Sequence, residues 1–274
     1  MQRLKNRKET DWIIVRGGGD LATGAVQRLH RAGFPVVVLE THTPLAIRRH
    51  VALSEAVTEK SWTVEDITAR LAATPEDIPV IQAQGDVPVF VDPEAALLQS
   101  FRPLVVVDAI LAKKNLGTTK DMGRAGTIAL GPGFVAGADV DIVIETMRGH
   151  HLGRLIFSGE AAPNTGTPGV IAGVDRERVI HAPASGILRT VQAIGEVTKQ
   201  GEPITYIGET PVPATIDGIL RGLLEDGMRV EKGLKMADID PRLSEQANCY
   251  TISEKARNLG GSVLEAVMIL CRRA

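Results

Sequence analysis

A glycine-rich turn near the start of the chain has the residue types and spacing of a phosphate site. Gly17, Gly19 and Ala22 match the pattern G-x-G-x-x-G/A, between an apolar run at 12–15 and a helical pattern at 20–32. In such a turn the first glycine permits the bend, the second lets the backbone approach a pyrophosphate, and the small third residue lets helix and strand pack closely. The N–H groups that begin the helix attract the phosphate. The predicted nucleotide-type site comprises Gly17, Gly18, Gly19, Asp20 and Ala22; the alternative is a turn without a ligand.

Glu40 is the acidic residue that a bound nucleotide would require. It follows the second apolar run, 36–39, and lies 23 residues after Gly17. A carboxylate at this point accepts hydrogen bonds from ribose hydroxyls, and it suits NAD better than NADP. Asp20 opposes a phosphate unless its side chain turns away as the N-cap of the helix. The basic residues that could contact phosphate, or be ordinary surface charges, are Arg16, Arg48 and Arg49.

A second group of polar residues is expected at the same edge of the sheet. Asp108 ends the buried run 104–107, and Thr118, Thr119 and Lys120 follow in a loop. Ligands of open α/β sheets bind at the carboxyl ends of the strands, and hydroxyl and ammonium groups suit an anion. These four residues are included in the predicted ligand site, with a solvated polar loop as the alternative.

The remaining reactive side chains form no recognisable catalytic set. His150 and His151 are adjacent, so they point in different directions and are poor partners for one metal. Cys249 and Cys271 lack metal-ligand spacing; Cys271 is expected in a core and Cys249 is expected to be the more exposed. The sequence contains no P-loop, G-x-S-x-G or H-E-x-x-H motif. No catalytic set and no metal site are therefore predicted; the two histidines are expected in a polar loop, with a catalytic or ligand role for one of them as the alternative.

Hydrophobic periodicity predicts the elements that position these residues. The runs at 12–15 and 36–39 flank the helix at 20–32, which makes a βαβ unit with parallel strands. Further helices are predicted at 63–73 and 93–101, and further strands at 79–83, 87–91, 104–107, 128–130 and 141–146. The pattern favours a Rossmann-like α/β domain with a parallel sheet at residues 11–160.

A repeat with an offset of 32 residues follows a glycine-rich connection at 159–173. The matching pairs are Gly186/Gly218, Ile187/Ile219, Leu188/Leu220, Arg189/Arg221, Gly195/Gly227 and Gly201/Gly233. Two strand–turn–strand units of this kind resemble a small all-β barrel-sandwich (biotinyl/lipoyl-like) domain, predicted at 176–242. Covalent biotin or lipoate is not expected, because the stretch 206–212 between the repeats has no lysine and Lys235 comes too late. Residues 243–274 are predicted to form a C-terminal helical segment that packs back on the first domain.

Composition excludes several classes of protein. The 274 residues include 31 basic and 33 acidic ones, a net charge of −2, which argues against a nucleic-acid binder. Two cysteines exclude a disulfide scaffold. No apolar run approaches the ~20 residues of a membrane span, and residues 1–11 lack the apolar region of a signal peptide. We expect a cytoplasmic protein without nucleic-acid or membrane partners.

Seven strings taken together resemble a known family. They are RGGGDLATG at 16–24, PLAIRR at 44–49, SEAV at 54–57, PVFVDP at 88–93, DIDPR at 238–242, ISEKAR at 252–257 and GGSVLEA at 260–266. The chain resembles the YqeB family, accessory proteins of selenium-dependent molybdenum hydroxylases, from about residue 12 to 270. The resemblance implies a role in maturing or supplying the cofactor of a xanthine dehydrogenase-like enzyme, as XdhC-type proteins do, and carries over no catalytic residue.

Two classes of function remain open. The first is a maturation factor that binds a nucleotide (NAD-type) or molybdenum cofactor and hands it to a molybdenum hydroxylase apoenzyme. The second is an enzyme, either an NAD(P)-dependent oxidoreductase or a nucleotide-handling enzyme acting on a small molecule. The sequence shows no proton donor paired with a hydride site, which favours the first class. A homo-oligomer is compatible with both.

Overall fold

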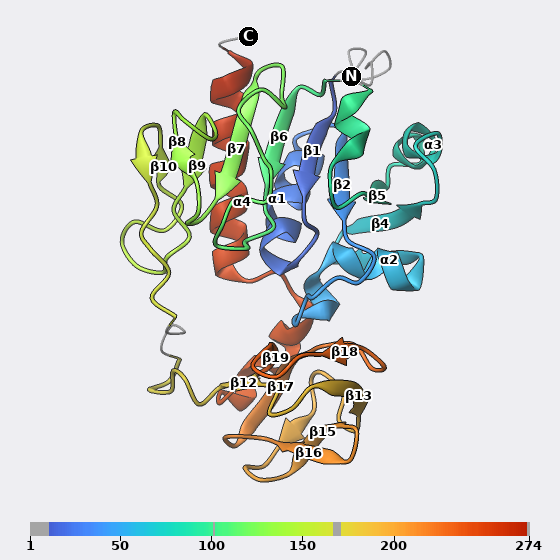
Figure 1. Cartoon of the computed structure of the whole chain (residues 1–274), viewed down its shortest axis with the longest axis vertical. Coiled ribbons are helices and arrows are strands. Elements are labelled where there is room, and N and C mark those ends of the chain that lie inside the picture. Colours follow the sequence, from blue (N-terminus) through green and yellow to red (C-terminus); the bar gives the residue numbers. More distant parts are fainter. Residues whose placement is uncertain (1–10, 101, 167–170, 273–274) are drawn as a thin grey trace. The chain divides into compact units, whose positions relative to one another are not determined.

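The chain folds into two compact units in this computed structural model, which describes residues 11–100, 102–166 and 171–272 (Figure 1). Unit 1 holds the described parts of Met1–Pro44, Ala52–Asn164 and Ile252–Ala274, and unit 2 those of Leu45–Val51 and Thr165–Thr251. Unit 2 therefore includes Leu45–Val51, a short segment from the first part of the chain, as well as the region of the repeat. Most of the stretch predicted to lack a signal peptide lies outside the described residues.

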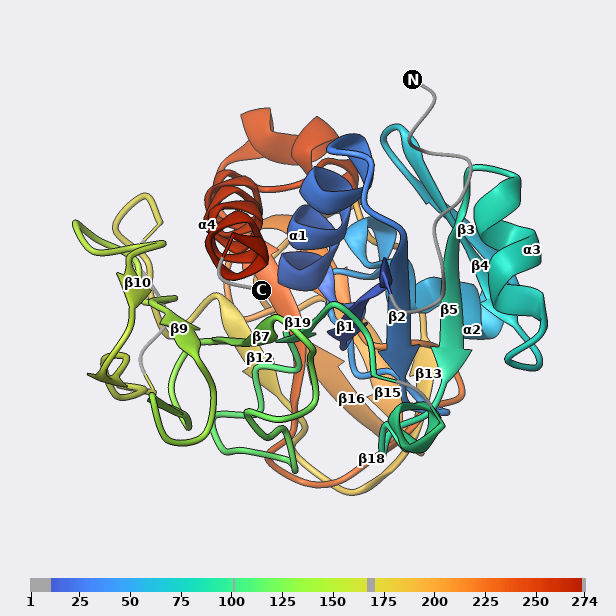
Figure 2. The same cartoon turned by 90° about the horizontal axis from the view of Figure 1, so that it is seen from above.

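Unit 1 is built on a nine-stranded sheet with the order β10-β9-β7-β6-β1-β2-β5-β4-β3 (Figure 2). Its strands are β1 (Ile13–Arg16), β2 (Val36–Glu40), β3 (Ser61–Val64), β4 (Ile67–Ala72), β5 (Val87–Val91), β6 (Val105–Asp108), β7 (Gly126–Leu130), β9 (Ile142–Ile144) and β10 (Leu155–Ile156). A separate pair consists of β8 (Val135–Ala136) and β11 (Gly159–Glu160). The helices are α1 (Asp20–Arg31), α2 (Ala56–Glu59), α3 (Asp77–Ala83) and α4 (Glu254–Cys271), with 3₁₀ turns η4 (Leu53–Glu55) and η5 (Ala96–Gln99).

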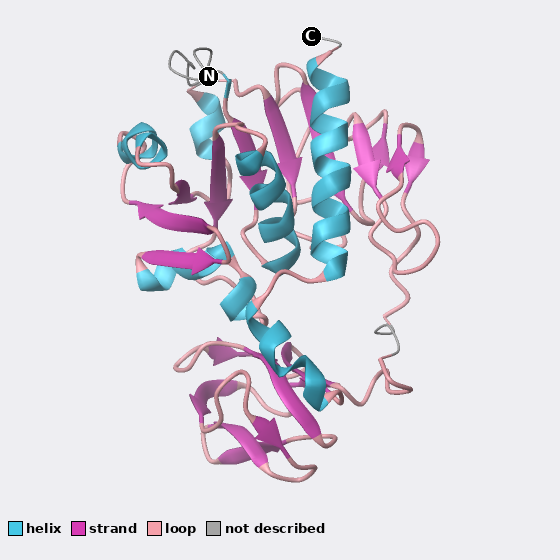
Figure 3. Cartoon of the chain, turned by 180° about the vertical axis from the view of Figure 1, so that it is seen from behind, coloured by secondary structure: helices cyan, strands magenta, loops and turns pink. Residues whose placement is uncertain are grey.

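The predicted fold class, a Rossmann-like parallel-sheet domain followed by a barrel-sandwich domain and a C-terminal helix, is wrong. The main sheet is large and mixed, because β3 pairs antiparallel with β4 and β10 pairs antiparallel with β9. Among the α-helices of the described residues, only α1 and α4 are longer than two turns, and both lie on the same face of this sheet (Figure 3). The C-terminal helix α4 belongs to unit 1, whereas the preceding segment from 243 to 251 belongs to unit 2.

The helix predicted at 63–73 is the hairpin of β3 and β4. β-branched side chains at Thr63, Val64, Ile67 and Thr68 favour extended backbone, and they outweigh the helical spacing of the apolar residues. Glu65 makes the tight turn between the strands with a φ of 54°. This hairpin occupies the place where a helix was expected.

Two further segments differ from the predictions. The strand predicted at 79–83 is the second half of α3, whose preceding loop is held by the Asp77 carboxylate, which accepts hydrogen bonds from the backbone N–H groups of Ala73 and Thr74. Within the described part of the helix predicted at 93–101, which leaves out residue 101, the structure has only the 3₁₀ turn η5, because the Asp92 carboxylate accepts hydrogen bonds from the N–H groups of Ala96 and Leu97. In both segments, hydrogen bonds from backbone N–H groups to a nearby aspartate carboxylate favour the local structure that is observed.

Unit 2 consists of two four-stranded antiparallel sheets with the orders β12-β19-β17-β14 and β16-β15-β13-β18 (Figure 1). The strands are β12 (Val179–His181), β13 (Gly186–Thr190), β14 (Val197–Thr198), β15 (Pro203–Ile207), β16 (Thr210–Pro213), β17 (Gly218–Leu223), β18 (Arg229–Val230) and β19 (Lys235–Asp240). Two 3₁₀ segments, η3 (Arg49–Val51) and η6 (Leu243–Tyr250), complete the unit. One apolar core, which includes Leu188, Ile207, Leu220 and Ile239, joins the sheets.

No helix in the described part of the chain combines the length and apolarity needed to cross a bilayer.

Candidate functional site

The glycine-rich turn joins β1 to α1 in the middle of the main sheet. Gly17 has a φ of 91°, and its N–H donates to the Leu39 carbonyl at 2.8 Å. A Cβ on Gly17 would lie 3.0 Å from the carbonyl oxygen of Ala109, so the turn needs glycine here for both conformation and space. Ala22 is fully buried in α1. These contacts bring β1, β2 and the loop after β6 together around one turn.

Gly19 is the open position of this turn. Its backbone is extended, with φ −65° and ψ −179°, and a Cβ built on it meets no atom within 4 Å. Gly19 is also the N-cap of α1, which leaves Asp20 as the first helical residue and corrects its predicted capping role. As a glycine, this N-cap residue has no side chain to cap α1, whereas the Ser253 hydroxyl of α4 accepts a hydrogen bond from Ala256 N. The start of α1, like those of α2 and α3, has no capping side chain on its N-cap residue, and it has space beside Gly19.

Glu40 lies against the turn at the end of β2. Its Oε1 accepts a hydrogen bond from Gly18 N at 2.7 Å, and its Oε2 accepts one from Thr41 N at 2.7 Å. Each carboxylate oxygen has a further lone pair, so the group can still accept a ribose hydroxyl. The hydrogen bond from Gly18 N to Oε1 also sets the negative charge of Glu40 beside an N–H group that a bound phosphate would otherwise use.

Asp108 and Thr118 form a buried bridge beside the turn. Thr118 Oγ1 donates to Asp108 Oδ2 at 2.6 Å and accepts from Arg16 Nη1 at 2.6 Å. Arg16 and Asp108 are register partners on β1 and β6, and both are 2% exposed. Burial raises the pKa of Asp108, while the Thr118 hydroxyl, Ile110 N–H and Arg16 oppose that rise. The bridge holds the loop after β6 in place, and its three polar side chains point at one another.

The other residues predicted to contact the ligand do not lie at the turn. Thr119 is exposed, and Lys120 lies 3.4 Å from Asp141 and donates to the Gly137 carbonyl. Arg48 and Arg49 belong to unit 2, where they bond the carbonyls of Asn248, Thr251 and Leu223. The structure therefore groups the glycines, Asp20, Ala22, Glu40, Asp108 and Thr118, and separates Thr119 and Lys120 from them.

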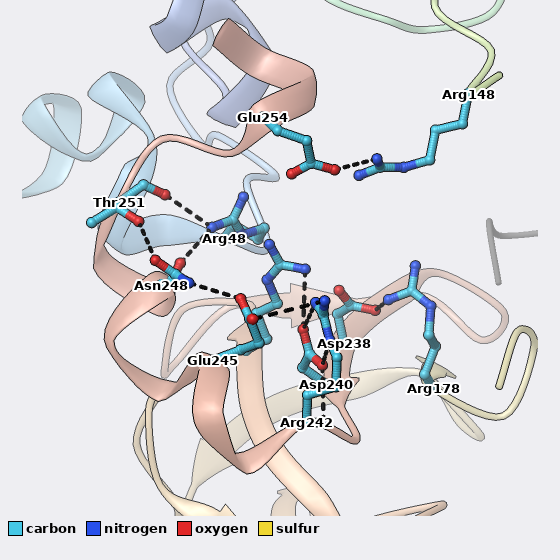
Figure 4. Close-up of polar contacts among 11 residues, drawn as sticks. Arg48, Arg148, Arg178, Asp238, Asp240, Arg242, Glu245, Asn248, Thr251 and Glu254 are labelled. Atoms are coloured by element: carbon cyan, nitrogen blue, oxygen red, sulfur yellow. Dashed lines mark hydrogen bonds and ion pairs between the residues drawn. The ribbon is translucent and has the colours of Figure 1, made fainter. Parts of the chain in front are cut away.

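Lys255 is a basic residue near the turn that the sequence did not reveal. It lies in the first turn of α4 and interacts electrostatically with Asp20 of α1 and with Glu145. Burial lowers its pKa, and nearby Arg148, which pairs with Glu254, adds to the shift (Figure 4). A lysine at a helix N-terminus is unfavourable, because its charge opposes the helix dipole. This unfavourable position is the one feature of the sequence that could have marked Lys255 as a candidate site residue.

The histidines and cysteines form no catalytic set. The rings of His150 and His151 lie edge to face with centroids 5.2 Å apart, and both residues are exposed. Cys249, expected to be exposed, is 1% exposed in the core of unit 2, and burial raises its pKa. Cys271, expected in a core, is only half-buried. No cluster of three or more His, Cys, Asp or Glu side chains suited to a metal occurs among residues 11–100, 102–166 and 171–272.

Comparison with known proteins gives one strong match. The chain is 50% identical over 258 residues to uncharacterized protein YqeB of Escherichia coli (strain K12), and the match covers 94% of this chain. This match supports the predicted likeness of the chain to the YqeB family. The chain spans about half of the YqeB protein it matches, 47% of its length. No family model matches the chain.

Solved structures resemble the chain only distantly. A succinylglutamate desuccinylase/aspartoacylase from Rhodobacter sphaeroides has 14% identity and a TM-score of 0.27, covering 85% of this chain and 86% of that one. A succinylglutamate desuccinylase from Silicibacter sp. TM1040 has 13% identity and a TM-score of 0.24, covering 85% of each. At these scores no reaction or ligand carries over to this chain.

Proposed function

We propose that this chain is a maturation factor for a selenium-dependent molybdenum hydroxylase and that it binds a nucleotide or molybdenum-cofactor-type ligand at the Gly17–Ala22 turn. The ligand's phosphate would lie against Gly19 at the start of α1, and its ribose would bond Glu40. The protein would hold the ligand and pass it to the hydroxylase apoenzyme.

The observation that carries the proposal is the open space at Gly19. Neighbouring backbone crowds Gly17 and Gly18, so structure alone accounts for those glycines, but nothing within 4 Å requires a glycine at 19. An uncapped helix start beside an empty approach suits an anion. Lys255 adds a positive charge near the same helix turn. The hydroxylase as partner rests on the sequence likeness to the YqeB family.

The second candidate is an NAD(P)-dependent oxidoreductase or nucleotide-handling enzyme. Lys255 favours it, because a lysine with a lowered pKa can serve as a general base or acid. The accessory function is preferred, since the polar side chains of Asp108, Thr118 and Arg16 beside the turn bond one another and not a substrate.

Deletion of the gene followed by purification of the hydroxylase tests the proposal. We expect a folded hydroxylase that lacks its cofactor and activity, and we expect the wild-type protein to restore both. Gly19→Val should fail to restore them, and Gly261→Ala, at another glycine with open space around it, should succeed. A hydroxylase with full cofactor content from the deletion strain would refute the maturation role and favour the enzyme.

A further inference from the structure

The 32-residue repeat maps one sheet of unit 2 onto the other. It relates β13 to β17, β14 to β18, β15 to β19 and β12 to β16, so the two strand orders are equivalent. The pairing registers agree as well: Arg229 opposite Ile187 corresponds to Val197 opposite Ile219. The burial of equivalent residues on the two outer faces can therefore be compared position by position.

The outer face of β17 is covered by the chain's own segments. Ile219 is fully buried, a Cβ on Gly222 would lie 2.7 Å from Ile47 Cγ2, and Leu223 N donates to the Ile47 carbonyl at 2.9 Å. Arg221 is also enclosed, with its side chain 12% exposed and 3.4 Å from the Asp240 carboxylate. Residues 45–51 and η6 supply this cover, and Arg242 fixes η6 to Asp240 at 2.8 Å (Figure 4).

The equivalent face of β13 has no such cover from any described residue. We call it the bare face, and it consists of Ile187, Arg189, Tyr206, Pro211 and Arg229, which the pairing registers place on one side of the sheet. Ile187 is 47% exposed, where its counterpart Ile219 is fully buried. Arg189 and Arg229 are exposed, and the Arg189 guanidinium lies 4.5 Å over the Tyr206 ring.

The repeat also shows what the bare face lacks. Asp240, the carboxylate beside Arg221, corresponds to Gly208, so Arg189 has no acidic partner in its own half. Arg229 forms no ion pair with the described residues. Two arginines around an isoleucine, a tyrosine and a proline make a basic, apolar surface of the composition that protein interfaces favour.

We propose that the bare face binds an acidic segment of a partner protein, in the way that residues 45–51 and η6 cover the equivalent face. The segment would place an apolar side chain on Ile187 and carboxylates at Arg189 and Arg229. A protein segment is favoured over a lipid surface, because the equivalent face is covered by polypeptide that bonds the strand backbone. The inference is independent of the ligand site in unit 1.

Site-specific photocrosslinking in cells tests the proposal with the full chain. A photoreactive residue replaces Ile187, and the peptide attached to it is sequenced by mass spectrometry. A second sample carries the photoreactive residue at Leu243, an exposed position on η6 away from the bare face. We expect Ile187 to capture one protein segment that contains Asp or Glu, and Leu243 not to capture it.

Charge reversal supplies the decisive comparison. Arg189→Glu and Arg229→Glu should each lower the adduct yield about tenfold or more, because they set like charges against each other. Arg189→Lys should retain the adduct, and so should Lys232→Glu, a matched exposed position off the face. An adduct with lipid, with a second copy of this chain or with a segment lacking acids, no adduct at all, or one insensitive to charge reversal would overturn the proposal.

Discussion

Gly24 of α1 and Gly260 of α4 meet where the two helices cross, and neither position has room for a side chain. A Cβ on Gly24 would lie 2.2 Å from the Ala256 carbonyl oxygen, and one on Gly260 would lie 2.3 Å from the Gly24 carbonyl oxygen. This close approach sets Lys255 beside the first turn of α1. The C-terminal helix thereby contributes to the candidate site at the beginning of the chain.

Gly260→Ala should destabilise the protein by about 1–3 kcal/mol, because the added methyl forces the helices apart. The neighbouring Gly261→Ala is the matched control, since its Cβ meets no atom within 4 Å. There the better helix propensity of alanine should raise stability by up to about 1 kcal/mol. Urea unfolding of both variants measures the difference, and equal stabilities would show that the crossing is not tight.

Thr118→Val should lower the free energy of unfolding by about 1–3 kcal/mol. The substitution removes the hydroxyl that links buried Arg16 to Asp108 and leaves each of these charged groups with one hydrogen-bond partner fewer. Thr119→Val, one residue on and exposed, should change stability little. Urea unfolding again provides the measurement. If the two variants were equally stable, the bridge would not hold the loop after β6.

Asp66 should remain ionised to about pH 2, because a hydrogen bond from Arg31 holds its pKa at about 2. A carboxyl whose folded-state pKa is lowered contributes stability that is present above its unfolded pKa of ~3.9 and is lost as pH falls through the folded value. NMR titration of the Asp66 carboxyl carbon measures the pKa. Arg31→Ala should raise it toward the ordinary value, whereas Arg102→Ala, a distant surface arginine, should leave it unchanged. An unaltered titration in Arg31→Ala would contradict the assignment.

Glu40→Ala should weaken ribose-bearing nucleotides by about 1–3 kcal/mol, the scale of a hydrogen bond to a charged group. Inorganic phosphate should bind at least as well as before, since the substitution removes the carboxylate from Gly18 N–H. Calorimetric titrations with both ligands separate the two effects. An equal loss for phosphate would assign Glu40 to the shape of the turn and not to ribose.

Local patterns in the sequence predict the part of the site that is local in the chain. The apolar run, the glycine turn, the helix and the strand ending at Glu40 occupy β1, α1 and β2. Their order follows from periodicity and from glycine positions that only a tight turn explains. The hairpin at β3 and β4 was missed, because its apolar residues fit a helical spacing while their β-branched shapes favour a strand.

Contacts between distant residues escaped prediction for a different reason. Lys255 approaches Asp20 only because two glycines let α4 cross α1, and no local pattern encodes that crossing. The hydroxyl of Thr118 turns inward because Arg16 and Asp108 are register partners across two strands, while Thr119 and Lys120 turn away. Side-chain direction in a loop depends on partners far along the chain.

Calorimetric titration of the wild-type protein and Gly19→Val with a panel of mono- and dinucleotides, NAD included, tests the central claim most directly. The Val side chain enters open space, so circular dichroism should match the wild type for Gly19→Val and for Gly261→Ala, and neither variant should unfold at a lower temperature. We expect wild type and Gly261→Ala to bind at least one member of the panel with equal affinity. Gly19→Val should bind it about tenfold or more weakly, because the side chain occupies the approach of the phosphate. Equal affinity in Gly19→Val, or no nucleotide binding by the wild type, would contradict the account.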